Sequence, residues 1–362
     1  MHKKINILHV IDTTGPGGAE TVFVTMCVAT KNQGYPTRAL LRGKGWLSQQ
    51  LENAGIDVDY YECKGSFNVS YLRFLRGYIR KHSIDTIHAH LLGSSVYCSL
   101  AAMLTKVTVV STFHGLVDVS EKERALWAKM KLIEFGSTHI VAVSNNLLEM
   151  LQQRLGVTGN KKLSLISNGI DTDKFSAQQH SEQYPDTIRF GCLGNVRKAK
   201  NYSLAVEFIK LLQDSGINCH LSIAGDNTNT LASDLLAYIK QLNITRYIDL
   251  KGFISDTPEY LSEIDVFLLS SSSEGHPLAL NQALAMELPI LTTPCGVEQF
   301  FPDNLLTVSR DFTAEGLKKA FNTMGIKPGD KRTVNTEGRK QVLQYYSETV
   351  MIQSYLNFYG AA

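Results

Sequence analysis

The sequence lacks an excess of one charge, paired cysteines and long hydrophobic runs, and each absence narrows the class of protein. Lys and Arg (36) nearly balance Asp and Glu (34), leaving a net charge of +2, so nucleic acid is not expected as a partner. The six cysteines form no CxxC pair, which favours reduced core thiols in a cytosolic protein over disulfides or zinc. No run of about 18 apolar residues is present, so no segment is predicted to span a bilayer.

What is present resembles an ordinary globular protein. The 362 residues are 44% hydrophobic and 19% charged, which suggests two domains that each bury a core. The first residues, MHKKINILHV, hold two lysines before only a short apolar run, so they are predicted to form a first strand and not a signal peptide.

Short apolar segments alternate with helical segments along the chain, apart from the polar, turn-forming stretch 168–187. Such alternation predicts an α/β fold of parallel sheets with helices on both faces. Two facing Rossmann-like doubly wound domains would leave a cleft at the carboxyl ends of their strands, where such sheets bind ligands. The predicted parts are an N-terminal domain at 1–170, a linker at 171–187, a second domain at 188–338, and a helical tail at 339–362 that packs across both domains.

The stretch 265–293 carries the most unusual chemistry and is predicted to form a strand, a turn, a helix and a strand. Gly275 permits a bend or close approach to a ligand, and Pro277 suits the first turn of a helix. The free amides of Leu278 and Ala279 would then point at an anion such as phosphate. Glu274 lies beside that position, which suggests a second ligand group such as sugar hydroxyls.

A glycine-rich turn, Gly15-Pro16-Gly17-Gly18, follows the first predicted strand. Glycines here let backbone amides meet a negatively charged group, and a plain tight turn is the alternative. The spacing is not GxGxxG, which disfavours an NAD-linked dehydrogenase.

Histidines end two predicted strands, in His88-Ala89-His90 and Thr112-Phe113-His114. A metal site would need a third ligand and a carboxylate shell, and neither is evident, so no metal site is predicted. His114 is followed by glycine at the lip of a central strand, so it is the candidate to touch substrate, with a structural histidine as the alternative.

Basic residues gather at three places. Arg197 and Lys200, in a turn after the first strand of the second domain, could clamp a diphosphate, although a solvated loop is the alternative. The segments 71–81 and 122–133 mix basic and apolar residues. They are interpreted as amphipathic helices docked on the sheet, with a surface for anionic lipid as the alternative.

Taken together, these segments resemble the retaining glycosyltransferases of family 4, which have the GT-B architecture. The resemblance covers essentially the whole chain and rests on the order and spacing of GGAE, STFHG, VAVS, NGIDTDKF, LGNVRKAKN, IAGD, KGF and SSSSEGHPLALNQALAMELPIL. It implies transfer of a sugar from a UDP- or GDP-sugar to a hydroxyl of a glycan or lipid-linked acceptor in surface polysaccharide or lipopolysaccharide synthesis, with retention at the anomeric carbon. It implies neither metal nor cofactor. The scattered cysteines predict a cytoplasmic protein, and the basic helices, as a lipid surface, would place it at the inner face of the cytoplasmic membrane.

The resemblance also implies roles for individual residues. Arg197 and Lys200 would hold the diphosphate, and Glu274 the donor-sugar hydroxyls. His114 would hydrogen-bond the sugar near the reacting carbon. The remaining donor-binding residues that it implies are Gly17, Gly18, Phe253, Gly275, His276, Leu278, Ala279 and Gln282.

Two positions depart from the family pattern. A second glutamate that grips the ribose commonly stands eight residues after the first, and here that residue is Gln282. Glutamine can donate and accept hydrogen bonds but lacks the charge that strengthens them. Asn195 stands where an arginine often follows the glycine of the diphosphate turn. The alternatives are therefore a non-catalytic subunit that binds nucleotide-sugar weakly, and a GT-B epimerase or hydrolase that converts donor without acceptor.

Overall fold

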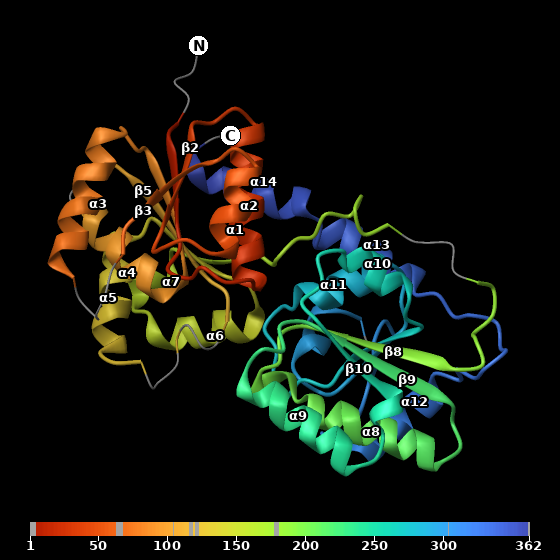
Figure 1. The fold of residues 1–362 in the computed structure, drawn as a ribbon. Helices are drawn as coiled ribbons and strands as arrows, with labels where there is room; N and C mark the ends of the chain where they lie inside the picture. The colour runs from red at the N-terminus through yellow and green to blue at the C-terminus, as the bar shows by residue number, and fades with distance from the viewer. Residues whose placement is uncertain are drawn as a thin grey trace. The chain divides into compact units, whose positions relative to one another are not determined.

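The structure, a computed structural model, describes residues 5–62, 68–103, 105–115, 119, 123–176, 181–302 and 304–360 (Figure 1). The chain divides into two compact units. The first joins Met1–Gly169 to Glu348–Ala362, and the second is Ile170–Ser347. Each unit holds one sheet whose strands all pair in parallel. The predicted pair of Rossmann-like parallel α/β domains is confirmed.

The first unit has a seven-stranded sheet in the order β3-β2-β1-β4-β5-β6-β7. The order reverses between β1 and β4, which makes this the switch point where doubly wound sheets bind ligands. The strands are β1 (Ile7–Val10), β2 (Thr37–Leu41), β3 (Asp57–Tyr60), β4 (Thr86–His90), β5 (Thr108–Phe113), β6 (His139–Ala142) and β7 (Leu163–Leu165).

Helices cover both faces of this sheet, because successive strand residues bury their side chains on opposite sides. Leu8, Val10, Ile87 and Ala89 pack with α3 and α4, whereas the alternate residues face α1 and α14 (Figure 1). The helices of this unit are α1 (Gly18–Asn32), α2 (Trp46–Asn53), α3 (Val69–Lys81), α4 (Leu91–Ala102), α5 (Leu126–Gly136), α6 (Asn145–Arg154), α7 (Val157–Asn160) and α14 (Glu348–Tyr359).

The second unit has a six-stranded sheet in the order β10-β9-β8-β11-β12-β13, with its switch point between β8 and β11. The strands are β8 (Ile188–Leu193), β9 (Cys219–Ala224), β10 (Ile248–Gly252), β11 (Val266–Leu269), β12 (Ile290–Thr292) and β13 (Thr307–Val308). The α-helices are α8 (Tyr202–Asp214), α9 (Thr230–Gln241), α10 (Thr257–Ser262), α11 (Leu278–Ala285), α12 (Ala314–Thr323) and α13 (Thr336–Tyr345), and the 3-10 helices are η2 (Lys198–Lys200), η3 (Thr245–Tyr247) and η4 (Val297–Phe300).

The predicted helical tail is two helices. The break lies at Tyr346–Ser347, so α13 belongs to the second unit and α14 to the first. Tyr355 and Tyr359 of α14 are fully buried against the first sheet.

Two predictions from composition can be compared with the structure. Five cysteines are buried and free, as predicted, while Cys63 lies outside the described residues. None of the described helices has the length and apolar character needed to cross a membrane.

Candidate functional site

Three glycines end adjacent strands at the carboxyl edge of the second sheet. Gly194 follows β8, Gly225 follows β9 and Gly252 closes β10, with φ of 148°, 149° and 71°. Side chains rarely adopt these φ values. A Cβ on Gly225 would overlap the carbonyl group of Gly194, so the turn after β9 needs glycine for space as well. The turns after β8 and β9 therefore pack backbone against backbone beside the switch point.

Lys200 and Glu274 meet at this edge. Lys200 ends η2, Glu274 lies in the turn after β11, and Nζ lies 2.7 Å from Oε1. The Ser271 hydroxyl donates to the same carboxylate oxygen at 2.5 Å. The side chains of Lys200 and Glu274 are 18% and 12% exposed, so the charges are held in place yet can be reached by a ligand.

Hydrogen bonds between the two turns fix this pair. The amide of Ser272 donates to the carbonyl of Ala199 at 2.8 Å, and the Ser270 hydroxyl donates to the carbonyl of Lys200 at 2.9 Å. The Glu274 amide donates to Cys295 O at 2.9 Å. The serine run in the sequence thus ties the basic turn to the acidic one.

Helix α11 begins directly after the turn. Pro277 is its N-cap, with extended backbone, so the prediction that it lies in the first turn is wrong by one residue. The Leu280 amide bonds to Pro277 O, whereas within the described chain the amides of Leu278 and Ala279 have no acceptor. These two amides are free to donate to an anion, and the phosphate contact expected from the sequence stays a prediction.

The other predicted donor-binding residues of this unit differ in accessibility. Arg197 is exposed and Phe253 is 54% exposed, while Gly275 and Gln282 are half-buried. His276 is only 4% exposed and packs against the rings of Phe300 and Tyr346, with centroids 4.7 and 4.6 Å away. Burial lowers the pKa of His276 to about 3, so the imidazole is neutral at physiological pH.

In the first unit, Gly17 is the N-cap of α1 and Gly18 its first residue. Gly17 has extended backbone, and a Cβ there would overlap the carboxylate of Glu20. Glycine therefore leaves room for the Glu20 side chain over the helix start. A carboxylate at this end also suits the helix dipole.

His114 follows β5 and belongs to a row of histidines. His114 Nε2 lies 2.9 Å from His90 Nδ1, and the two rings stack 5.2 Å apart. Burial lowers the pKa of His114 to about 3. His88, two residues before His90 on the same face of β4, and His9, its partner on β1, extend the row. From the sequence we expected no third ligand beside His88 and His90, and the structure supplies His9.

Three residues of these sites were not predicted from the sequence: His9, Ser271 and Gly225. The glycine after each of β8, β9 and β10 was a usable signal, because the three stand at the same place in each repeat of strand and helix. His9 had no such signal in the sequence, because strand pairing, and not local sequence, brings its neighbours to it.

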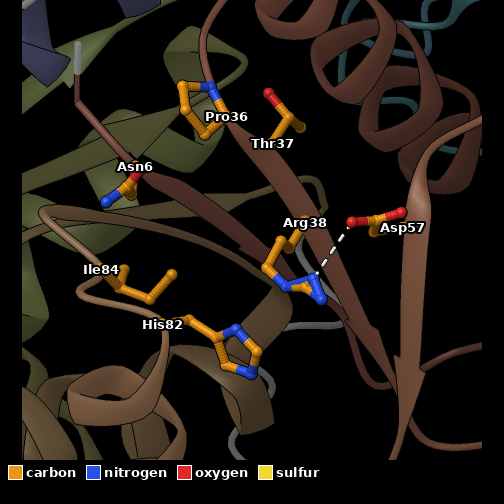
Figure 2. A pocket seen from close by; sticks show the side chains of 7 residues that line it. All are labelled: Asn6, Pro36, Thr37, Arg38, Asp57, His82 and Ile84. Carbon is orange, nitrogen blue, oxygen red and sulfur yellow. Dashed lines mark hydrogen bonds and ion pairs between the residues drawn. The ribbon is translucent and has the colours of Figure 1, made fainter.

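A separate small pocket of about 170 Å³ lies at the opposite, amino edge of the first sheet (Figure 2). Figure 2 shows the ion pair between Arg38 and Asp57 at its wall, with Nη1 and Oδ2 3.1 Å apart. Parallel sheets bind ligands at their carboxyl edge, so this pocket is not the candidate site.

A two-unit parallel α/β fold with cations, a carboxylate and a helix start at one carboxyl edge is typical of enzymes that bind phosphate-containing ligands. The model for "Glycosyltransferase Family 4" matches residues 16–174, and the model for "Glycosyl transferases group 1" matches residues 187–323. Together they cover most of the chain. The chain belongs to the family 4, group 1 glycosyltransferases of GT-B fold, and the predicted family is confirmed.

Curated relatives agree. The chain is 25% identical over 316 residues to the UDP-Gal:alpha-D-GlcNAc-diphosphoundecaprenol alpha-1,3-galactosyltransferase of Escherichia coli, covering 81% of this chain and 80% of that one. It is 25% identical over 292 residues to the capsular polysaccharide biosynthesis glycosyltransferase CapH of Staphylococcus aureus, covering 77% and 78%.

Solved structures share the fold. A glycosyltransferase from Rickettsia africae superposes with a TM-score of 0.83 at 18% identity, covering 99% of this chain and 98% of that one. HepE of Anabaena, solved with UDP and glucose, superposes with a TM-score of 0.82 at 15% identity, covering 99% and 100%.

Proposed function

We propose that this glycosyltransferase moves a sugar from a nucleotide diphosphate-sugar to a hydroxyl group of a glycan or lipid-linked acceptor, with retention at the anomeric carbon. The ion pair between Lys200 and Glu274 carries the proposal. It holds a cation for a diphosphate and a carboxylate for sugar hydroxyls in contact at one carboxyl edge. The glycosyltransferase relationship and the solved complex of HepE with UDP and glucose support this choice of donor.

In the proposed donor complex, Lys200 and Arg197 bind the diphosphate. As the bond between the sugar and the diphosphate breaks, negative charge develops on the leaving oxygen, and nearby cations stabilise that charge. The amides of Leu278 and Ala279 donate to the phosphates from the start of α11. Cations and a helix start thus offset the charge, and no metal ion takes part in the step.

Glu274 accepts hydrogen bonds from the hydroxyls of the donor sugar. Ser271 and Lys200 hold its Oε1, so the carboxylate keeps one orientation before the sugar arrives. Gly275 lets the donor approach the turn, and Gln282, on α11, bonds the ribose. Phe253, more than half exposed, packs on the nucleobase. His276 supports the turn from beneath, because its ring is buried.

The family resemblance assigns three residues of the first unit to the substrates. His114 is a neutral imidazole and hydrogen-bonds the sugar, while Gly17 and Gly18 present the backbone at the start of α1. The galactosyltransferase of Escherichia coli is named for a diphosphoundecaprenol acceptor, and CapH for capsular polysaccharide synthesis. These names support a lipid-linked acceptor in surface polysaccharide or lipopolysaccharide synthesis.

A lipid-linked acceptor places the enzyme at the inner face of the cytoplasmic membrane, resting there through α3 and α5. Arg73, Arg76 and Arg80 are exposed on α3. On α5, Trp127 is 74% exposed and Phe135 62% exposed. Basic and aromatic side chains of this kind suit the headgroup region of anionic lipid.

Donor binding is tested by thermal unfolding of the chain with UDP, GDP and ADP and their sugars. A ligand at about a hundred times its Kd should stabilise by about 2.7 kcal/mol. The donor that stabilises the chain, radiolabelled in its sugar, is then incubated with the enzyme and lipid-linked acceptors. NMR of the product gives its anomeric configuration. Turnover without acceptor would identify an epimerase or hydrolase, and binding without turnover a non-catalytic subunit. If no nucleotide stabilises the chain, the proposed donor site is wrong.

Membrane contact is tested by flotation with vesicles of phosphatidylglycerol and phosphatidylcholine. The chain should float at low salt and less at high salt, and Trp127→Ala should float less. Leu236→Ala, on the exposed Leu236 of α9 in the second unit, is the control. No flotation at low salt would remove the membrane proposal and leave the donor assignment intact.

A further inference from the structure

We propose that His9, His88 and His90 form a site for a first-row divalent cation, with Zn²⁺ as the representative ion. The three side chains are buried on one face of the first sheet, and one ligand atom from each lies within 4.8 Å of the others. Imidazole nitrogen is a preferred ligand of zinc, copper and nickel. His90 bonds to His114, but His9, His88 and His90 have no role in the proposed donor site, and the metal proposal does not depend on that site.

The register of the strands places the three rings together. His9 on β1 pairs directly with His88 on β4, and His90 follows two residues later on the same face. The ring centroids of His88 and His90 lie 4.0 Å apart, and those of His9 and His88 lie 5.5 Å apart. Phe23 of α1 and Tyr355 and Tyr359 of α14 close over them.

Hydrogen bonds fix the His9 proton and leave a lone pair inside the cluster. His9 Nε2 lies 3.2 Å from Thr30 Oγ1, whose own hydrogen goes to the carbonyls of Met26 and Cys27. Thr30 therefore accepts from His9, so the proton is on Nε2 and Nδ1 carries the lone pair. His9 Nδ1 is buried, and no group in the described part of the chain forms a hydrogen bond with it. A buried acceptor without a donor is costly, and a cation would satisfy it.

His90 has the same arrangement. Its Nδ1 bonds to His114 Nε2 at 2.9 Å, and its Nε2 is buried with no hydrogen-bond partner among the residues that the structure describes. Metal-bound histidines characteristically bond through their other ring nitrogen, which orients the ligand. If the ion binds Nε2 of His90, the His90 proton is on Nδ1 and is donated to Nε2 of His114. The proton of neutral His114 must then be on its Nδ1, so the ion would also fix the tautomer of His114.

His88 is the third proposed ligand, and metal binding would replace one of its hydrogen bonds. Thr112 Oγ1 donates to the Tyr355 hydroxyl and so accepts from His88 Nε2, at 2.9 Å. His88 Nδ1 therefore accepts from the Tyr359 hydroxyl, at 2.6 Å. The ion would take the place of that hydroxyl at Nδ1. A zinc–nitrogen distance of about 2.0–2.1 Å also requires the rings to close by about an ångström.

The test is Zn²⁺ binding by the full chain after chelator treatment, measured by metal analysis after gel filtration and by the thermal midpoint. His9→Gln keeps a donor toward Thr30 but removes Nδ1, and His90→Asn keeps the contact with His114 but removes Nε2. Both variants should fold, by circular dichroism, and bind Zn²⁺ at least about 10–100-fold more weakly than the wild type. His220→Gln, on a partly exposed histidine of β9 beside Asp249, is the control and should bind like the wild type.

Two results would overturn the site. The first is that the wild-type chain retains no Zn²⁺. The second is that His9→Gln and His90→Asn retain as much Zn²⁺ as the wild type, which would mean an adventitious ion only. Because both variants could fail to fold, Co²⁺ is also added to the wild-type chain. Visible absorption of four-coordinate, nitrogen-bound cobalt supports the site, and the spectrum of hexaaquo cobalt rejects it.

Discussion

Lys200 Nζ and Glu274 Oε1 lie 2.7 Å apart although the residues are 74 positions apart in sequence. Two turns from neighbouring strands, β8 and β11, bring them together at the switch point of the second sheet. In the proposed donor complex Lys200 binds the diphosphate and Glu274 the sugar, and in the structure each side chain already holds the other in place. This preorganisation is the basis of the first prediction.

Lys200→Ala should lower kcat/KM by about 10²–10³-fold, the usual loss for one group that stabilises developing charge. Its effect on unfolding should be smaller than its effect on turnover, because the side chain lies on a short 3-10 turn and not in the core. Steady-state kinetics and thermal unfolding measure the two effects. Lys198→Ala removes an exposed cation from the same turn and is the control. Equal rates for both variants would refute the role of Lys200.

The turn after β11 shows what local sequence can predict. A strand ending in four serines, then Glu274, Gly275 and Pro277, indicated strand, turn and helix, and the structure has them with Pro277 shifted by one residue. Spacing of apolar residues and turn-forming residues both act over a few positions. The alternation of strands and helices in both domains is predictable for the same reason.

The histidine row shows what local sequence leaves out. His9 meets His88 through parallel pairing of β1 and β4, and α14 adds tyrosines from the other end of the chain. These contacts depend on register and on where the tail docks. The break at Tyr346 and Ser347 was likewise missed, since the helical pattern continues through it.

Gly225→Ala should destabilise the second unit strongly. The backbone at Gly225 has φ of 149°, and the added methyl would overlap Gly194. Strain and overpacking together should cost about 2–5 kcal/mol in the free energy of unfolding. Gly216→Ala is the control, with φ of 78° and open space around it, and should cost about 1–2 kcal/mol. Denaturant titration compares them, and equal losses would show that the overlap is relieved by movement.

His276→Gln should make stability less sensitive to acid. The native pKa of His276 is about 3 because of burial, against 6.5 when exposed, so the unfolded chain binds the extra proton as pH falls. The contribution of neutral His276 to the free energy of unfolding is fully present above pH 6.5 and is lost progressively as the pH falls towards 3. Between pH 8 and pH 5 this histidine should account for about 2 kcal/mol of the loss.

The measurement is urea unfolding at both pH values for the wild type and the variant. Other buried histidines contribute to both chains, so the difference between the two pH-dependent losses isolates His276. Glutamine is neutral at both pH values. It can keep a hydrogen bond to Asn281, whose Nδ2 lies 3.4 Å from His276 Nε2 in the wild type. Identical losses in the two chains would mean that His276 becomes accessible to protons in the folded state.

Gln282→Glu should tighten binding of the donor. Gln282 is half-buried in the second turn of α11, at the position where the family pattern places a ribose-binding glutamate. A charged acceptor makes stronger hydrogen bonds to hydroxyls than an amide does, so the Kd should fall by about tenfold. Isothermal titration with the donor and its 2′-deoxy analogue measures the change, and the gain should shrink for the analogue. Gln241→Glu, an exposed change of equal charge at the end of α9, is the control. An equal gain for both sugars would place Gln282 away from the ribose.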